Sequence, residues 1–357
     1  MQHLPARPAP RALRGPRAPR TVRAARVLTP LLVSGLVLAG CGGGGDEGGQ
    51  EEPAGDEPTS AAAPQEPATW PLTGLEVEGG GDADQPHPAY VVKIDNTASS
   101  APQRGLHRAD LVVEELVEGG TTRLAAFFHT RLPQVVGPVR SMRASDIGIV
   151  TPAKATVVTS GAAPVTIRRV QQAGITFIGE GAPGVFRDGA RSAPYNLMAD
   201  LADIGTRARK SAPDPAAYLE WGTPEDVPQG RPARRLEAFF GSHTTTWEFG
   251  RGTYRNVGSY AAPDEQFEAD TVLVLRVEVG DAGYRDPAGN FVPETKFQGT
   301  GAAMLFHGGR MVRGTWSKQG LGAPLTLRTP QGPLRVPAGH TWIELVPRDG
   351  GDVRVGR

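Results

Sequence analysis

Cysteine is almost missing from this sequence of 357 residues, in which Cys41 is the only one. A single cysteine excludes a disulfide within the chain. The sequence also lacks HExxH, CxxC and EF-hand motifs, and no two of its seven histidines stand at the spacing of metal ligands. We therefore expect no metal site and no cofactor.

Long hydrophobic runs are missing too. The apolar stretch from Val27 to Leu38 is shorter than the ~20 residues that a membrane-spanning helix needs. Seven arginines precede it, and it ends in Leu-Ala-Gly-Cys at residues 38–41. This arrangement resembles a bacterial lipoprotein signal, in which residues 1–40 are removed and Cys41 becomes the acylated N-terminus. The alternative is an ordinary secretory signal in which the cysteine stands by chance.

Acidic residues do not occur before Asp46. The whole sequence has 38 basic and 38 acidic side chains, but seven of the basic ones lie in residues 1–40. The chain from Cys41 onward therefore has 31 basic against 38 acidic side chains, a formal charge of −7. Because a protein that binds nucleic acid through its phosphates has the opposite sign, the charge argues against nucleic acid as a partner.

Residues 42–69 contain no lysine, arginine or aromatic side chain, whereas seven of these 28 residues are glycine and seven are acidic. Such a segment cannot bury enough apolar surface to offset the loss of chain entropy on folding. We interpret residues 41–69 as the acylated cysteine followed by a disordered tether, which holds a folded part away from the membrane.

The pattern becomes that of a folded protein from residue 70. Five prolines between residues 213 and 232 break regular structure, so we place a linker at 211–235 between domains at 70–210 and 236–350. In the first domain we expect strands at 90–95, 121–129, 155–159 and 175–178, a strand or short helix at 111–117, and a helix at 164–173. Asn196 is expected to cap a helix that contains Leu197, Leu201 and Ile204. This alternation favours an α/β domain with a mixed sheet, parallel pairing and flanking helices.

The second domain shows mainly strand signals. Glycine-containing turns separate two hairpin candidates, and the expected strands are 244–249, 253–257, 271–279, 302–306, 311–316, 325–328, 333–336 and 341–346. We expect a smaller, mostly-β and antiparallel domain. Its Trp316 and Trp342 are interpreted as core residues, with a sugar-stacking platform as the alternative.

Residues 179–184 match the G-x-G-x-x-G pattern of dinucleotide-binding loops and follow an expected strand. The residues after the match do not begin an amphipathic helix, which that fold requires. We interpret the segment as a glycine-rich loop.

Charged side chains gather at expected strand ends of the first domain, where α/β sheets place ligands. Arginine presents a planar fork of donors that suits carboxylate or phosphate, so we expect a polar pocket in which Arg123, Arg140 and Arg143 bind an anion. Glu118 and Asp188 orient these arginines, or act as acid and base if chemistry occurs. The other residues assigned to the pocket are Ser141, Arg187, Arg191 and Asn196.

The structural alternative for these pocket residues is an internal network of ion pairs and caps that fixes loops. Ser141 has no assigned base that would make it a nucleophile. His129 shares the face of Arg123 if residues 121–129 form a strand, and it is interpreted as a packed residue.

Several motifs resemble the DUF3048 family of YerB-like lipoproteins. They are PLTGL at 71–75, IDN at 94–96, PQRGL at 102–106, EGGTTR at 118–123, GPVRSMR at 137–143, FRD at 186–188, RSAPYNL at 191–197, GTWSK at 314–318 and GHTWI at 339–343. Tyr195 departs from the pattern, because the family often has histidine there. The resemblance implies a two-domain architecture and an envelope location, and it implies no reaction.

The sequence thus predicts a lipid-anchored protein on the extracytoplasmic face of the cell membrane. The leading function is a binding or accessory role toward a wall glycan, a peptide, an anionic polymer or an envelope enzyme. One alternative is a hydrolase or transferase for an anionic envelope substrate, and another is a structural interaction module.

Overall fold

The computed structural model describes residues 67–208 and 215–357. The expected signal at 1–40, the acylated Cys41 and the tether up to residue 66 lie outside the described residues. No helix in the described part of the chain is long and apolar enough to cross a membrane.

The first half of the described chain contains short helices and short strands. In chain order they are β1 (Tyr90–Asn96), β2 (Leu111–Leu116), β3 (Thr122–Phe128), α1 (Asp146–Val150), β4 (Thr156–Val158), α2 (Pro164–Gln172), β5 (Phe177–Ile178), β6 (Val185–Arg187), β7 (Leu197–Ala199) and α3 (Leu201–Thr206). Single turns of 3-10 helix lie at Glu78–Gly80, Ala98–Ser100, Leu106–Arg108, Glu118–Gly120, Thr151–Ala153 and, in the second half, Pro224–Asp226.

The second half consists almost entirely of strands. They are β8 (Trp221–Gly222), β9 (Arg231–Pro232), β10 (Arg235–Phe239), β11 (Thr244–Gly250), β12 (Thr253–Asn256), β13 (Glu268–Ala269), β14 (Thr271–Arg285), β15 (Phe291–Lys296), β16 (Gly299–His307), β17 (Arg310–Lys318), β18 (Thr326–Thr329), β19 (Gly332–Pro333), β20 (Val336–Pro337), β21 (Thr341–Pro347) and β22 (Asp352–Gly356).

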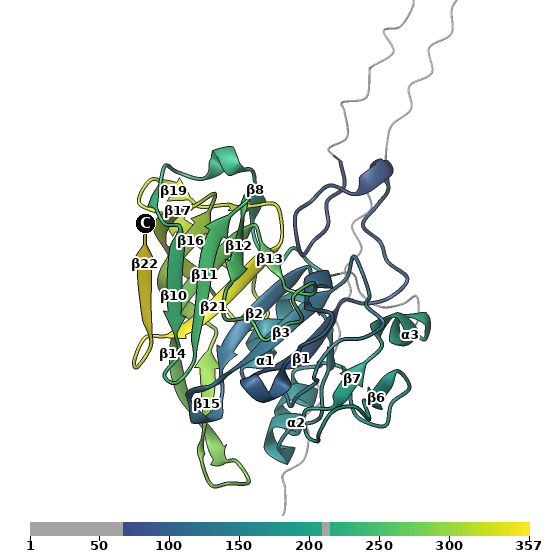
Figure 1. Ribbon diagram of the computed structural model, residues 1–357. Helices are drawn as coiled ribbons and strands as arrows, with labels where there is room; N and C mark the ends of the chain where they lie inside the picture. The colour runs from purple at the N-terminus through teal and green to yellow at the C-terminus, as the bar shows by residue number, and fades with distance from the viewer. Residues whose placement is uncertain (1–66, 209–214) are drawn as a thin grey trace, which may run out of the picture. The chain divides into compact units, whose positions relative to one another are not determined.

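One large mixed sheet runs through both halves of the chain, in the order β19-β18-β17-β16-β14-β21-β2-β3-β1-β4-β5. Figure 1 shows the C-terminal strand β21 between β14 and β2. The pairs β14–β21, β21–β2, β1–β4 and β4–β5 are parallel, and the other pairs along this order are antiparallel. The prediction of a purely antiparallel C-terminal part was therefore wrong at β21.

A second sheet, in the order β13-β12-β11-β10-β22, covers one face of the large sheet. Its Trp247 packs edge-on against Trp342 of β21, with ring centroids 5.1 Å apart. Trp342 and Trp316 are 2% and 1% exposed, so both are core residues and neither forms a sugar-stacking platform. Burial of such aromatic side chains is a large share of what holds the two sheets together.

The description of the first half as a helix-flanked α/β layer overstates its helices. α1, α2 and α3 have five, nine and six residues, and mainly strands and loops cover the sheet. The strands expected at 90–95 and 121–129 are confirmed, 111–117 is a strand, and the helix expected at 164–173 is α2. The G-x-G-x-x-G match at 179–184 is a loop between β5 and β6, as expected.

The prediction of a helix directly after Asn196 was wrong. Leu197–Ala199 forms β7, which pairs with β6, and α3 begins only at Leu201. The side chain of Asp200 caps α3 by accepting a hydrogen bond of 2.8 Å from the amide of Asp203. An aspartate directly before the helix offers a shorter path to these free amides than Asn196, and the spacing of the apolar residues could not reveal it.

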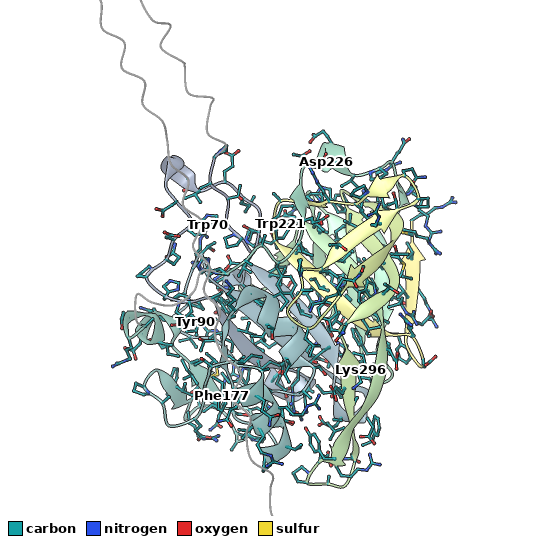
Figure 2. The ribbon with its side chains drawn as sticks, turned by 180° about the vertical axis from the view of Figure 1, so that it is seen from behind. Trp70, Tyr90, Phe177, Trp221, Asp226 and Lys296 are labelled. Carbon is teal, nitrogen blue, oxygen red and sulfur yellow. The ribbon has the colours of Figure 1, made fainter. Side chains whose placement is uncertain are left out.

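Trp221 of the second half holds the segment around Pro71 and Gly74 in place. Trp221 donates from Nε1 to the carbonyl of Pro71 at 3.0 Å, and Figure 2 shows Trp70 and Trp221 near each other. Gly74 lies against the Trp221 ring with a φ of +69°, where an added Cβ would come within 2.5 Å of the ring. Only glycine fits this contact without displacing the indole.

Candidate functional site

The ends of three neighbouring strands carry a concentration of charge. Asp95 of β1 and Glu115 of β2 both lie beside Arg123 of β3 in the sheet register. Side chains alternate between the faces of a strand, so Glu115 points toward α1 while the preceding Glu114 points toward the second sheet. The contacts agree, because Glu115 shares Lys93 with Asp146 of α1, whereas Glu114 bonds to Thr245 of β11.

Arg143 and Glu118 form a two-pronged ion pair. Nε and Nη2 of Arg143 each donate to one carboxylate oxygen of Glu118 at 2.7 Å, and Nη1 donates to the carbonyl of Met142 at 3.0 Å. Burial raises the pKa of Glu118, but the hydrogen bonds and charge of Arg143 outweigh it and hold this pKa below its ordinary value. Arg143 is thus committed to protein partners, and Glu118 is held ionised.

Arg140 is partnered by an acid and an aromatic ring. Its Nε donates to Oδ2 of Asp95 at 3.0 Å, and its guanidinium carbon lies 5.1 Å from the centroid of the Tyr195 ring. Tyr195, the residue that departs from the family pattern, therefore stacks on an arginine.

Arg123 differs from its two neighbours. Its Nη1 donates to the carbonyl of Ser141 at 2.8 Å, whereas Nε and Nη2 donate to no described residue. Arg123 lies where the central strands end, and the residue is 8% exposed. Its Nε and Nη2 keep contact with solvent. Burial, then the charges of Arg143 and Arg140, lower the pKa of Arg123 to about 10. Arg123 is a charged donor with two open positions beside two further cations.

Ser141 has a hydroxyl partner and no base. Its Oγ lies 3.1 Å from Oγ of Ser160, and no histidine or carboxylate of the described residues bonds to it. Nothing in this geometry activates Ser141 as a nucleophile.

The remaining predicted residues form a second set on the 187–196 segment. Arg187 grips both carboxylate oxygens of the exposed Glu180 at 2.6 and 2.7 Å, and its Nη1 donates to Oδ1 of Asn196 at 2.6 Å. Arg191 donates to the carbonyls of Ser100 and Pro102 and lies 3.4 Å from a carboxylate oxygen of Asp188. This set contacts the first one through Tyr195 and serves to fix the segment.

The sequence analysis missed a buried triad on the α1 side. Nζ of Lys93 lies 2.6 Å from Glu115 and 2.7 Å from Asp146, and the three side chains are at most 1% exposed. Burial raises the pKa of Glu115 to about 7, with the charge of Asp146 adding to the effect and that of Lys93 opposing it. Burial lowers the pKa of Lys93, but the two carboxylates outweigh it and raise this pKa above its ordinary value.

A second missed cluster lies on the other face, where Glu114 of β2 is in register with Glu344 of β21. Burial and the charge of Glu114 raise the pKa of Glu344 well above its ordinary value, and Glu344 accepts a hydrogen bond of 2.7 Å from Trp247. Burial also raises the pKa of Glu114, but His243, 3.3 Å away, outweighs it and keeps this pKa below its ordinary value. The geometry thus favours a protonated Glu344 beside an ionised Glu114.

The signal for both clusters was the pair Glu114-Glu115 inside an otherwise apolar strand. Period-two geometry places such neighbours on opposite faces of a sheet, so each needs a partner from a different covering layer. The identity of these partners, Lys93 and His243, depends on long-range pairing that the spacing does not encode.

No group of three or more histidine, cysteine, aspartate or glutamate side chains within 67–208 and 215–357 is placed to hold a metal ion. The fold and the site define a two-sheet, β-rich protein with charge networks buried at the ends of its central strands. Residues 72–214 match the family described as "Protein of unknown function (DUF3048) N-terminal domain", and residues 237–343 match its C-terminal domain. The chain belongs to the DUF3048 family.

Two comparisons extend this result. Over 73 residues the chain is 45% identical to a protein of Bacillus subtilis (strain 168) named "Putative lipoprotein YerB", a match that spans 21% of that protein and 20% of this chain. The crystal structure of YerB from Bacillus subtilis superimposes with a TM-score of 0.66 at 20% identity, covering 80% of this chain and 99% of the other. The second comparison concerns the fold alone.

The Glu115 carboxyl predicts a pH dependence of stability. Its pKa is about 7 in the folded chain and near its ordinary 4.5 when unfolded, so the folded state binds the extra proton between these values. The stabilisation from this group is therefore present below pH 4.5 and lost as the pH rises to about 7. For Glu115→Gln, we expect the free energy of unfolding to fall less steeply over this range, by up to ~1.4 kcal/mol per pH unit.

Urea unfolding at pH 5, 6, 7 and 8 measures this difference. Glu180→Gln is the matched control, because the ion pair with Arg187 lowers the pKa of Glu180 and moves its titration below this range. Parallel pH profiles for the wild type and Glu115→Gln would contradict the assignment.

Proposed function

We propose that this chain is a lipid-anchored, extracytoplasmic binding protein of the cell envelope that takes up an anionic group at Arg123. The anchor is supported by the lipoprotein-type sequence that ends at Cys41, and by the word "lipoprotein" in the name of the Bacillus relative. The binding role is supported by the geometry at the ends of β1 and β3.

A single observation carries the anion site. Arg123 is a nearly buried guanidinium that has one main-chain acceptor, two open donors and no carboxylate partner among the described residues. A buried charge without a counter-charge is unfavourable, and the lowered pKa of Arg123 expresses this cost. A bound carboxylate or phosphate oxygen accepts from both donors and supplies the missing charge.

The surroundings of Arg123 favour an anion over a neutral ligand. Three arginines meet there, Arg123, Arg140 and Arg143, while the carboxylates that partner them are Asp95 and Glu118. Asp95 pairs with Arg140 and Glu118 with Arg143, so neither carboxylate forms an ion pair with Arg123. Partial burial weakens solvent screening, so the charge of Arg123 acts more strongly than it would on an open surface.

The enzymatic alternative has less support. An acid catalyst needs a carboxyl of raised pKa that can reach substrate. Glu118 has a lowered pKa and both oxygens held by Arg143, and Asp188 is engaged by Arg191 and by the amide of Ala190. The described carboxyls of raised pKa are Asp110, Glu115 and Glu344, and all three are buried.

The third alternative, a structural interaction module, draws support from the partnered Arg143 and Arg187. An unfolding experiment in the presence of anions distinguishes it from the binding role, because a module without an anion site gains no specific stabilisation from them. The candidate ligands of the binding role remain a wall glycan or peptide with acidic groups, an anionic polymer, or an acidic surface of an envelope enzyme.

The anchor is tested by Cys41→Ala in the full-length chain, expressed in a bacterium that has lipoprotein processing. We expect the wild type to incorporate labelled palmitate and to sediment with membranes, and the variant to lose the label. A variant that keeps the label would contradict acylation at Cys41.

The anion site is tested by thermal and urea unfolding of the chain from residue 41 onward in inorganic phosphate. A site with a Kd of about 1 mM adds ~2.7 kcal/mol to the free energy of unfolding at 100 mM phosphate. We expect Arg123→Gln to lose this specific gain and Arg123→Lys to keep part of it.

Phosphate also stabilises folded proteins without binding, so the comparison between variants decides. Arg235→Gln is the matched control, because Arg235 lies in exposed ion pairs with Glu237 and Glu248 on the second sheet. An equal gain in the wild type, Arg123→Gln and Arg235→Gln would refute the anion site and favour the structural module.

A further inference from the structure

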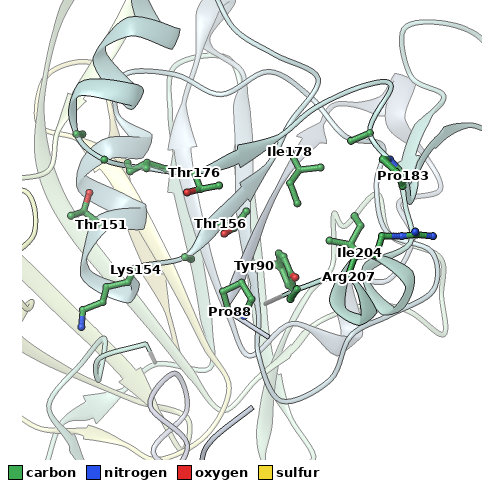
Figure 3. A pocket seen from close by; sticks show the side chains of 16 residues that line it. Pro88, Tyr90, Thr151, Lys154, Thr156, Thr176, Ile178, Pro183, Ile204 and Arg207 are labelled. Carbon is green, nitrogen blue, oxygen red and sulfur yellow. The ribbon is translucent and has the colours of Figure 1, made fainter. Parts of the chain in front are cut away.

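A cleft lies at the β5 edge of the large sheet, far along the sheet from the C-terminal strands. It has a volume of about 790 Å³, within the range of small-molecule sites, and is lined by β1, β4, β5, α3 and the glycine-rich loop at 179–184. Figure 3 shows Tyr90, Thr156 and Thr176 in the cleft, with Ile178 and Ile204 beside them. We name it the β5 cleft.

The floor of the β5 cleft is a row of hydroxyl groups. Tyr90 of β1 pairs with Thr156 of β4, and the register Val157 to Phe177 places Thr156 beside Thr176. Neighbouring strands are ~4.8 Å apart, so these side chains follow one another across the sheet on one face. None of the three hydroxyls bonds to a described residue, although Tyr90 is only 2% exposed.

The walls of the β5 cleft are apolar, and its charge has one sign. Ile175, Ile178, Pro183 and Ile204 line it, and no aspartate or glutamate of the described chain does. An apolar cleft without acids accepts a hydrophobic chain with an anionic group and disfavours a cationic one.

The two cations of the cleft are not equivalent. Figure 3 places Lys154 and Arg207 on opposite sides. Arg207 is occupied by a two-pronged ion pair with Asp203, whereas Lys154 has no ion pair with a described residue. Lys154 also has a φ of +49°, a left-handed conformation that glycine adopts at lower cost. Lysine is thus held where the backbone would favour glycine. Its side chain is exposed, and Figure 3 shows its ammonium group pointing away from the floor hydroxyls.

We propose that the β5 cleft binds a single-chain anionic amphiphile, an acyl or isoprenyl chain with a carboxylate or phosphate head group. The oxygens of the head group bond to the floor hydroxyls, the exposed Lys154 side chain turns toward it, and the chain runs between Ile178 and Ile204. Such a molecule occurs in the membrane to which the proposed anchor ties the protein. The source of the ligand thus rests on the proposed anchor, whereas the cleft shares no residue with the Arg123 site and is tested separately from it.

The test is calorimetric titration of the chain from residue 41 onward with dodecyl phosphate below its micelle concentration. Dodecyltrimethylammonium reports the role of head-group charge, and inorganic phosphate reports the role of the chain. We expect saturable binding of dodecyl phosphate, at least tenfold weaker binding of the cationic amphiphile, and no binding of inorganic phosphate beyond that which Arg123→Gln removes.

Variants assign the two parts of the ligand. Lys154→Gln is expected to weaken the binding of dodecyl phosphate about tenfold, because one charge-assisted contact is lost. Lys154→Arg is expected to restore this binding. Ala182→Phe, which fills the cleft from the loop, is expected to weaken both amphiphiles. Arg313→Gln is the matched control, because Arg313 is an exposed cation of β17 without an ion pair to a described residue.

The outcomes separate the proposals. Equal binding of both amphiphiles, unchanged in Lys154→Gln, would overturn the assignment of the head group, and absence of saturable binding would overturn the site. Arg123→Gln is expected to bind dodecyl phosphate as the wild type does. Loss of binding in Arg123→Gln but not in Ala182→Phe would show that the ligand sits at Arg123 and would refute the cleft.

Discussion

The pairing of charges buried at the ends of β1, β2 and β3 is the constraint on which the rest of this structure depends. A charge removed from water needs a partner, and these partners come from different layers of the fold. Lys93 and Glu115 require Asp146 of α1, and Glu114 requires His243 and Thr245 beside the second sheet. The same strands therefore fix the helical side, the second sheet and the turn at Glu118–Gly120.

Within this network almost every charge has a counter-charge, and Arg123 is the exception at its edge. In the proposed function Arg123 holds an anion with little rearrangement, because its two open donors are already in place. The β5 cleft adds a place for a hydrophobic chain on another part of the sheet. Both features suit a protein that meets acidic, partly apolar molecules near a membrane surface.

Much of the local structure could be predicted, because period-two patterns mark the strands and proline marks the start of α2. The position of β21 between the two halves could not be predicted. Its partner β2 lies more than 200 residues earlier in the sequence, and such parallel pairing leaves no local sequence pattern. The predicted arginines do lie near one another, yet sequence alone could not tell Arg143, which is fully engaged, from Arg123, which is not. That distinction depends on where tertiary packing places Glu118, the first residue of the turn at Glu118–Gly120.

The most direct test of the open donors on Arg123 is anomalous diffraction from crystals of the chain from residue 41 onward soaked in selenate. The account predicts a selenium peak beside Arg123, with selenate oxygens within hydrogen-bonding distance of Nε and Nη2, and no peak at the Arg143–Glu118 pair. A map in which a protein carboxylate occupies both donors, with no selenium beside Arg123, would contradict it.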